Sequence, residues 1–231
     1  MDRFHPFSKE HLLILAVGFA GIAAFLLVGR LGGKPRRTST LLLAALNLLA
    51  NPLSALAPFF QGIEMQPEQY LPFHLCDIAA LVAAAALLTR QRLLGSLTYF
   101  WGLAGTIQGL VTPAITDGGW VCSTFFFQHF VIVAAALHLP IVEGWRPRRP
   151  LWKAVTEVFL WSLLYLLFAL AMNRLTGANF AYASHPPENP SLLDHLGPWP
   201  WYLLSMQGIA VGFFSLLCLP FLRSPESAPK S

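Results

Sequence analysis

Seven long apolar segments, separated by short polar loops, constrain this chain more than any other feature. A helix needs about 20 mostly apolar residues to cross the hydrocarbon core of a bilayer. The segments long enough to do so are residues 12–31, 38–60, 72–89, 93–111, 121–143, 153–175 and 199–222. Charged residues make up only 11% of the 231 residues, against about 25% in soluble domains. The sequence therefore predicts an all-α polytopic membrane protein with seven transmembrane helices.

The length leaves room for one compact unit. We expect residues 1–223 to form a single seven-helix membrane domain and residues 224–231 to form a polar, disordered tail. The first apolar run, residues 12–31, is longer than the core of a signal peptide, and no A-x-A site precedes the basic segment after it. We therefore expect this run to remain a helix of the mature protein.

The Lys and Arg residues predict how the helices are oriented. On alternate sides of the seven predicted spans, twelve of the 15 Lys and Arg residues fall on one side and three on the other. The positive-inside rule assigns the richer side to the cytoplasm. The N-terminus is then outside and the C-terminus cytoplasmic. The net charge of +4 does not indicate nucleic-acid binding, because the basic residues lie in short groups between apolar runs.

Tryptophans lie at the predicted membrane boundaries, as expected of amphipathic rings at the level of the headgroups. Trp120, Trp199 and Trp201 lie at outer boundaries, and Trp145 and Trp152 lie at inner ones. This distribution favours the same set of spans.

Polar residues concentrate in the outer half of the predicted membrane region, although they come from separate stretches of sequence. They are His74, Cys76, Asp77, Gln108, Thr112, His129, Asp194 and His195, with Trp199 beside them. Buried polar groups in a bilayer often mark function, so this asymmetry predicts a polar pocket that opens outward. It is less typical of a transporter, which usually has polar groups near the midplane. We interpret the midplane residues Asn47 and Asn51 as forming interhelical hydrogen bonds at a kink that Pro52 makes in its helix.

Cys76 and His129 are the candidate reactive pair, because they come from different helices at a similar depth. A thiolate can attack an acyl carbonyl while an imidazole transfers the protons. Cys76 follows Pro72 near a helix N-terminus, and the positive end of the helix dipole favours a thiolate. Asp77 and His74 share a helix face, so Asp77 either orients His74 or has a purely structural role.

Three other interpretations of these residues remain open. Cys76 and His129 could be packed core residues, or Cys76 could form a disulfide with Cys122. His74, Cys76, His129 and His195 could bind zinc, but His74 and Cys76 point to different faces of their helix. We rank metal binding below covalent catalysis, and we predict neither a metal nor another cofactor. The three cysteines, which include Cys218, form no C-x-x-C motif.

Gly102, Gly105 and Gly109 lie on one face of the fourth predicted span. Small residues at this spacing favour close helix packing. Assembly with another chain, including a second copy, through this face is the alternative.

Four motifs connect the candidate residues to a known family. They are LPFHLCDI (71–78), YFWGLAGTIQGLVTP (99–113), FFFQH (125–129) and SLLDHLGPWPWY (191–202). In this order they resemble the YwaF-type bacterial integral membrane family, whose eukaryotic relatives are the transmembrane protein 164 group. The resemblance implies a seven-helix fold and Cys/His-dependent acyl transfer on phospholipids, with Cys76 as nucleophile and His129 as base. It also implies a bacterial inner membrane location.

We therefore expect a lipid acyltransferase or acyl hydrolase that works in the outer leaflet through a thioester. His74, Asp77, Gln108, Thr112, Asp194, His195 and Trp199 are the expected substrate-binding residues. The expected partner is a membrane lipid or fatty acyl substrate. The alternative function is a substrate-binding or transport protein that uses the same pocket without covalent chemistry.

Overall fold

A computed structural model describes residues 4–187 and 192–222, and every regular element within these residues is helical. The elements are α1 (Lys9–Arg30), α2 (Gly33–Gln61), α3 (Pro67–Tyr70), α4 (Leu75–Thr89), α5 (Arg92–Phe100), the π-helix η1 (Trp101–Thr106), α6 (Ile107–Val111), α7 (Gly119–Ile141), α8 (Leu151–Thr176), η2 (Phe180–Tyr182), η3 (Leu192–His195), α9 (Trp201–Leu217) and η4 (Leu219–Phe221). The predicted tail, residues 224–231, lies outside the described residues.

Within the described part of the chain, six helical stretches are long and apolar enough to cross a membrane. They are α1, α2, α7, α8, the α3–α4 stretch Pro67–Thr89 and the α9–η4 stretch Trp201–Phe221. The predicted all-α class is confirmed, and the chain is an integral membrane protein. The predicted segment 93–111 is helical as well, but it divides into α5, η1 and α6. The interruption is the six-residue π-helix, which widens the turn in the middle of this segment.

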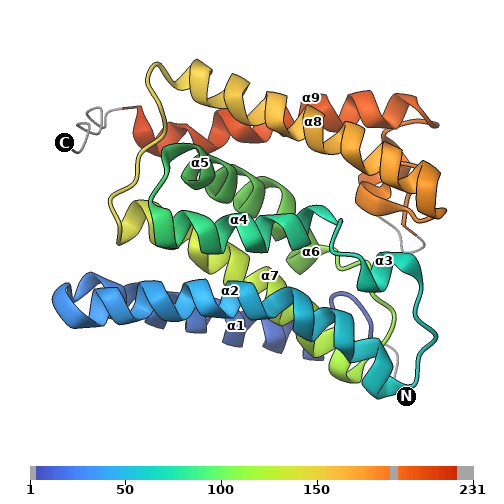
Figure 1. Ribbon diagram of the computed structural model, residues 1–231, viewed down its shortest axis with the longest axis horizontal. Coiled ribbons are helices and arrows are strands. Elements are labelled where there is room, and N and C mark those ends of the chain that lie inside the picture. Colours follow the sequence, from blue (N-terminus) through green and yellow to red (C-terminus); the bar gives the residue numbers. More distant parts are fainter. Residues whose placement is uncertain (1–3, 188–191, 223–231) are drawn as a thin grey trace.

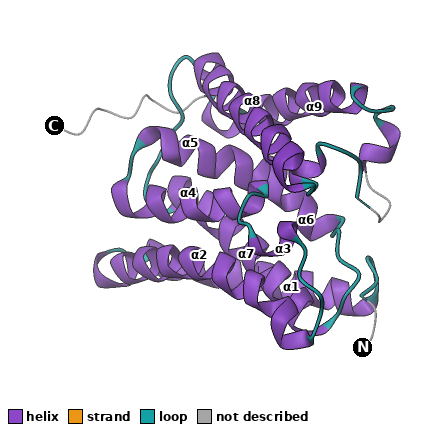
Figure 2. Ribbon diagram, turned by 45° about the vertical axis from the view of Figure 1, so that its right-hand side comes forward, coloured by secondary structure: helices purple, strands orange, loops and turns teal. Residues whose placement is uncertain are grey.

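The helices form three layers with α7 at the centre (Figure 1). α1 and α2 make one outer layer, α4, α5 and α7 lie in the middle, and α8 and α9 make the other outer layer, as Figure 2 also shows. Burial follows this arrangement: 56% of the apolar window of α7 is buried inside the protein, against 11% for α1 and 11% for α8. The apolar residues of α1 and α8 therefore face outward, where lipid would cover them.

Close packing of the middle layer depends on glycine. A Cβ on Gly102 would lie 2.8 Å from Ala136 Cβ of α7, and one on Gly105 would lie 3.0 Å from Leu75 Cδ2 of α4. The interpretation of these glycines as a close packing surface is confirmed. Gly102 and Gly105 thus pack against α7 and α4 of the same chain.

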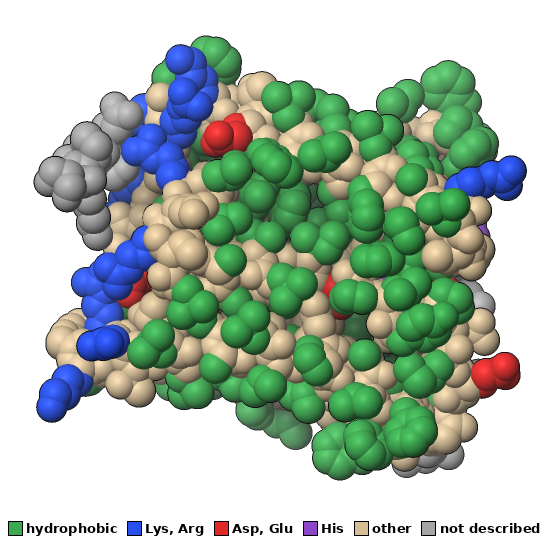
Figure 3. Space-filling model, in the orientation of Figure 1, with side chains coloured by type: hydrophobic (Ala, Val, Ile, Leu, Met, Phe, Trp, Pro, Cys, Tyr) green, Lys and Arg blue, Asp and Glu red, His purple; other side chains and the backbone are tan. Residues whose placement is uncertain are grey.

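Lys and Arg side chains gather mainly at one end of the molecule (Figure 3). The carboxylate of Glu143, just beyond α7, binds Arg36 of α2 at 2.8 Å and Arg90 at the end of α4 at 3.1 Å. It also accepts a hydrogen bond of 2.7 Å from the Thr40 hydroxyl. These contacts join the ends of α2, α4 and α7.

Candidate functional site

A cavity of about 780 Å³ lies between the middle layer and the α8–α9 layer. One part of its wall is polar and includes Cys76, Asp77, Gln128 and His129. Another part is apolar and is formed by Leu166 of α8 and by Met206, Ile209, Phe213 and Phe214 of α9. The apolar surface is hollowed between α8 and the middle layer (Figure 3). The cavity can therefore hold a molecule that has a polar and an apolar part.

Cys76 lies in the first turn of α4, which begins at Leu75. The helix starts here because the Asp77 carboxylate accepts a hydrogen bond of 3.1 Å from the His74 backbone N–H, as a capping residue does. Cys76 lines the cavity, whereas Cys122 and Cys218 are buried elsewhere in the core. All three cysteines are free thiols. The disulfide interpretation, Cys76 with Cys122, is therefore wrong in this structure.

His129 lies almost three turns into α7, and a carbonyl of its own helix sets its tautomer. Nδ1 lies 2.7 Å from the Phe125 carbonyl oxygen. A carbonyl can only accept, so Nδ1 carries the proton and Nε2 keeps a lone pair. The ring packs 4.1 Å from the Phe125 ring, centroid to centroid. On its other side it lies against Gly109, where a Cβ would come within 2.4 Å of Nε2 and Cδ2.

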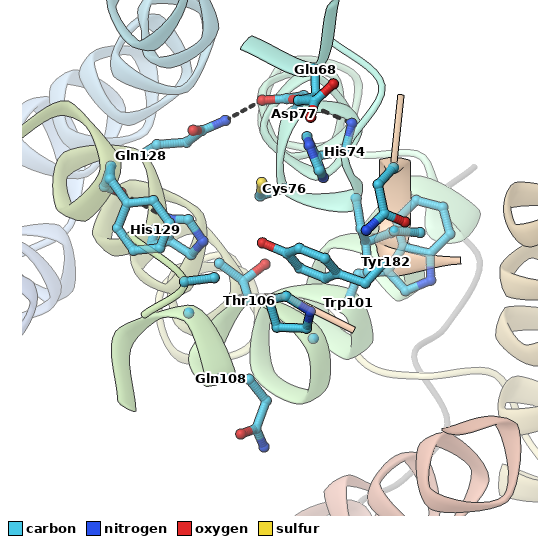
Figure 4. Close-up of a pocket in the computed structure, with 18 of the residues that line it drawn as sticks. Glu68, His74, Cys76, Asp77, Trp101, Thr106, Gln108, Gln128, His129 and Tyr182 are labelled. Atoms are coloured by element: carbon cyan, nitrogen blue, oxygen red, sulfur yellow. Dashed lines mark hydrogen bonds between the residues drawn. The ribbon is translucent and has the colours of Figure 1, made fainter. Parts of the chain in front are cut away.

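Cys76, Thr106 and His129 face one another across the cavity from α4, η1 and α7 (Figure 4). Among the described residues the structure has no hydrogen bond between the Cys76 thiol and the His129 imidazole. Such bonds are often long or poorly aligned before substrate binds. The arrangement supplies a thiol, an imidazole with a free lone pair and a hydroxyl around one space.

A hydrogen-bond network holds the polar wall together. The Gln128 side-chain amide donates to Asp77 Oδ1 and to Asn51 Oδ1, each at 2.8 Å (Figure 4). Asn51 Nδ2 in turn donates to the Asp77 carbonyl at 3.0 Å. Asp77 thus joins α4 to α2 and α7 and binds the His74 backbone, which favours its structural interpretation. The interpretation of Asn51 as an interhelical hydrogen-bonding residue is confirmed, and that of Asn47, which donates to the Val131 carbonyl at 3.1 Å, is confirmed too.

The structure brings together only some of the residues that the sequence predicts to bind substrate. His74, Asp77, Gln108 and Thr112 line the cavity, and Asp194, His195 and Trp199 do not. Gln108 extends to a different side of the space from Cys76 (Figure 4). The exposed Trp199 donates its indole N–H to the Ala183 carbonyl at 3.1 Å. Among the described residues, no group of three or more His, Cys, Asp or Glu side chains could hold a metal ion.

The loop after α8 contributes a residue that sequence reasoning missed. Tyr182 lines the cavity, and its backbone has a positive φ of 51°. The loop is held in place by Asn173, which donates to the Phe180 carbonyl at 3.1 Å and accepts from the Phe180 N–H at 2.7 Å. Burial, and next the proximity of the Cys76 sulfur, raise the pKa of Tyr182 to about 12. Tyr182 therefore stays a neutral phenol.

Thr106, Gln128 and Tyr165 are further cavity residues that the sequence did not single out. Thr106 and Gln128 stand inside the segments YFWGLAGTIQGLVTP and FFFQH, so their position beside the candidate residues was the available signal. Tyr165 stands in an apolar helix with no such signal. Its hydroxyl donates to the Phe73 carbonyl at 3.2 Å, which ties α8 to the start of α4.

The fold and the site define an all-helical integral membrane protein whose internal cavity combines a thiol, an imidazole and an apolar wall. The TMEM164 family model matches residues 6–218, and the chain belongs to the TMEM164 family. It is 29% identical over 160 residues to an uncharacterized protein of Treponema pallidum (strain Nichols). The aligned part covers 67% of this chain and 63% of that relative, less than two thirds of its length. No solved structure matches the chain.

Proposed function

We propose that this protein is a lipid acyltransferase or acyl hydrolase in which Cys76 forms a thioester with a fatty acyl group. The observation that carries the proposal is the selective placement of Cys76. It is the one cysteine of the three that lines the cavity, and His129 lines the same cavity. The orientation of His129, with Nε2 left to accept a proton, supports its role as the base.

The proposed reaction has two halves. His129 Nε2 takes the thiol proton, and the Cys76 sulfur attacks the ester carbonyl carbon. The tetrahedral intermediate collapses to a thioester, and the leaving alcohol oxygen takes the proton from Nε2. An acceptor alcohol or water then repeats these steps in reverse, and the acyl group leaves on its oxygen. Transfer and hydrolysis differ only in this acceptor.

The apolar wall supports a lipid as the substrate. Residues of α8 and α9, including Leu166, Phe213 and Phe214, would surround the acyl chain. His74, Gln108 and Thr112 are the proposed contacts for the polar part of the lipid within the cavity. Asp194, His195 and Trp199 are the proposed contacts for its headgroup at the outer rim.

We also propose that α5, η1 and α6 together form a seventh span, since the helical path from Arg92 to Val111 is unbroken in sequence. With seven spans, the N-terminus lies outside, the C-terminus lies in the cytoplasm, and the polar wall faces the outer leaflet. A bacterial inner membrane is the proposed location.

The first test labels the thiols of the purified, full-length protein. A long-chain acyl-mimetic thiol probe is applied to wild type, C76A and H129A, and the adducts are mapped by mass spectrometry. We expect Cys76 to react at least tenfold faster than Cys122 and Cys218, which serve as internal controls. H129A should slow the labelling of Cys76 alone.

The second readout is acyl release or transfer from fluorescent phosphatidylcholine in mixed vesicles. C76A should lower the rate by about 10³-fold or more, because a covalent catalyst loses its nucleophile. Unchanged turnover by C76A would rule out the thioester mechanism.

The second candidate function is capture or transport of an amphipathic molecule without covalent chemistry. The observation that favours it is the lack of a Cys76–His129 hydrogen bond among the described residues. If this candidate is right, a fluorescent lipid binds wild type and C76A equally, and neither forms an adduct with the probe.

A further inference from the structure

The hydroxyl of Thr106 is buried and has no hydrogen-bond partner. Thr106 is 3% exposed and lines the cavity. Its Oγ1 is one of four buried side-chain polar atoms that lack a partner in the part of the chain that the structure describes. Of the others, Asn47 Oδ1 and His138 Nδ1 belong to residues outside the cavity wall. An unpaired hydroxyl in an apolar interior is unfavourable, so a bound molecule that accepts its hydrogen bond would bind more tightly.

The local backbone explains why Thr106 has no partner. In α-helices, Ser and Thr hydroxyls commonly donate to the carbonyl four residues earlier. The hydroxyls of Ser96, Thr98, Thr112, Thr124 and Ser162 all do so here, at 2.8–3.2 Å. Thr106 is the last residue of the π-helix η1, in which backbone hydrogen bonds run to the fifth residue and the turn is wider. The change of helix type frees its hydroxyl toward the cavity.

Three other donors around Cys76 are already bound to protein acceptors. Gln128 donates to Asn51 and Asp77, and the Trp101 indole donates to the Ser162 hydroxyl at 2.9 Å. The Tyr165 hydroxyl donates to a backbone carbonyl. Unlike these three, Thr106 can donate to a bound molecule without first breaking an existing bond, and its hydroxyl is buried and unpaired.

We propose that the Thr106 hydroxyl stabilises the oxyanion that forms when Cys76 attacks an ester carbonyl. The backbone N–H of Cys76, in the first turn of α4, is the second donor to this oxygen, since the N–H groups of Asp77 and Ile78 are already bound to the His74 carbonyl. This proposal rests on the proposed thioester function and adds a catalytic residue to it.

The role of Thr106 lies in one step of that reaction. As the carbon–sulfur bond forms, the carbonyl π pair moves onto the oxygen, and the thiol proton moves to His129 Nε2. Thr106 donates its hydrogen bond to the charged oxygen and keeps its proton throughout. When the oxyanion collapses, the carbonyl re-forms, the carbon–oxygen bond of the ester breaks, and the alcohol leaves with the proton from His129.

The test compares two reactions of the same thiol in purified full-length protein. Acylation by p-nitrophenyl octanoate passes through an oxyanion, and each event releases one p-nitrophenolate. Alkylation of Cys76 by iodoacetamide displaces iodide and forms no oxyanion. The ratio of the two rates in one preparation does not depend on the fraction of protein that is folded. T106V, T106S and the control T98V are measured beside wild type; Thr98 is fully buried and its hydroxyl is bound to Leu94.

We expect T106V to lower the maximal acylation rate about 10²-fold, the typical loss for one oxyanion donor, with little change in the half-saturating ester concentration. Iodoacetamide alkylation should stay within about twofold of wild type, T106S should recover most of the acylation rate, and T98V should match wild type. An unchanged ratio in T106V, or failure of T106S to recover the rate, would overturn the role of Thr106. If wild type and C76A release p-nitrophenolate equally slowly, the thioester function itself fails.

Discussion

At Gly109, one hydrogen atom in place of a side chain leaves room for the His129 imidazole. An added Cβ would lie 2.4 Å from both Nε2 and Cδ2, so the ring must move. We expect G109A to slow both acylation and alkylation of Cys76 by about 10-fold or more, since small displacements of a catalytic group are costly. Both reactions slow because His129 acts on the thiol, whereas T106V should affect only acylation.

Gly208 of α9 provides the control, because a Cβ there would meet no atom within 4 Å. G208A should behave as wild type in both assays. Equal thiol reactivity in G109A and G208A would show that His129 does not activate Cys76 from this position.

The cavity residues differ in how much the sequence reveals of them. Cys76 and His129 are predictable because a thiol and an imidazole are scarce in apolar helices, and the topology brings them to a similar depth. Gln128 and Thr106 are common residue types in membrane helices. Their importance arises from a hydrogen-bond network and from a change in helix type, and both depend on the tertiary packing.

The end of α7 is tied to α2 and α4 through Glu143, whose side chain is 4% exposed. Burial by itself would raise the pKa of this carboxyl, but hydrogen bonds from Arg36 and Thr40 and the charge of Arg90 lower it overall. We expect E143Q to lower the free energy of unfolding by about 2 kcal/mol, the typical loss for a buried hydrogen bond to a charged group. The melting temperature should fall by about 5 °C in a detergent thermal-shift assay.

The pH dependence of this loss follows from the lowered pKa. The contribution of Glu143 is complete above the unfolded carboxyl pKa of about 4.3 and disappears as the pH falls through the lower folded value. The difference between wild type and E143Q should therefore shrink as the pH falls below the unfolded carboxyl pKa and disappear below the lower folded value. E64Q, at an exposed loop residue, is the control and should match wild type. If the melting temperatures of wild type and E143Q still differ at low pH, Glu143 stabilises the protein through packing and not through its charge.

Helix positions were more predictable than helix interiors. The predicted segment 12–31 corresponds to α1 at Lys9–Arg30, and 153–175 corresponds to α8 at Leu151–Thr176. The length of the apolar run in the sequence determines where such a helix begins and ends. The π-helix was not predicted, because neighbouring helices and not local preferences fix an interruption where Gly102 and Gly105 pack closely.

The arrangement of the loops relative to the membrane can be tested without knowing the substrate. The N-terminal segment lies beside the loop before α7, since the Phe4 N–H donates to the Thr116 carbonyl at 3.0 Å. These segments belong to the end opposite the Lys and Arg cluster in the predicted topology. Asp117 and Lys34 are exposed residues at the two ends.

Single cysteines at these two positions report the orientation, in a chain whose native Cys76, Cys122 and Cys218 are replaced by alanine. With a membrane-impermeant maleimide on intact bacterial cells, D117C should be labelled and K34C should react only after permeabilisation. The physical reason is that the twelve basic residues favour the cytoplasmic side. Labelling of K34C alone in intact cells would show that the protein has the opposite orientation. The polar wall would then face the cytoplasm, and the proposed lipid substrate would have to come from the inner leaflet.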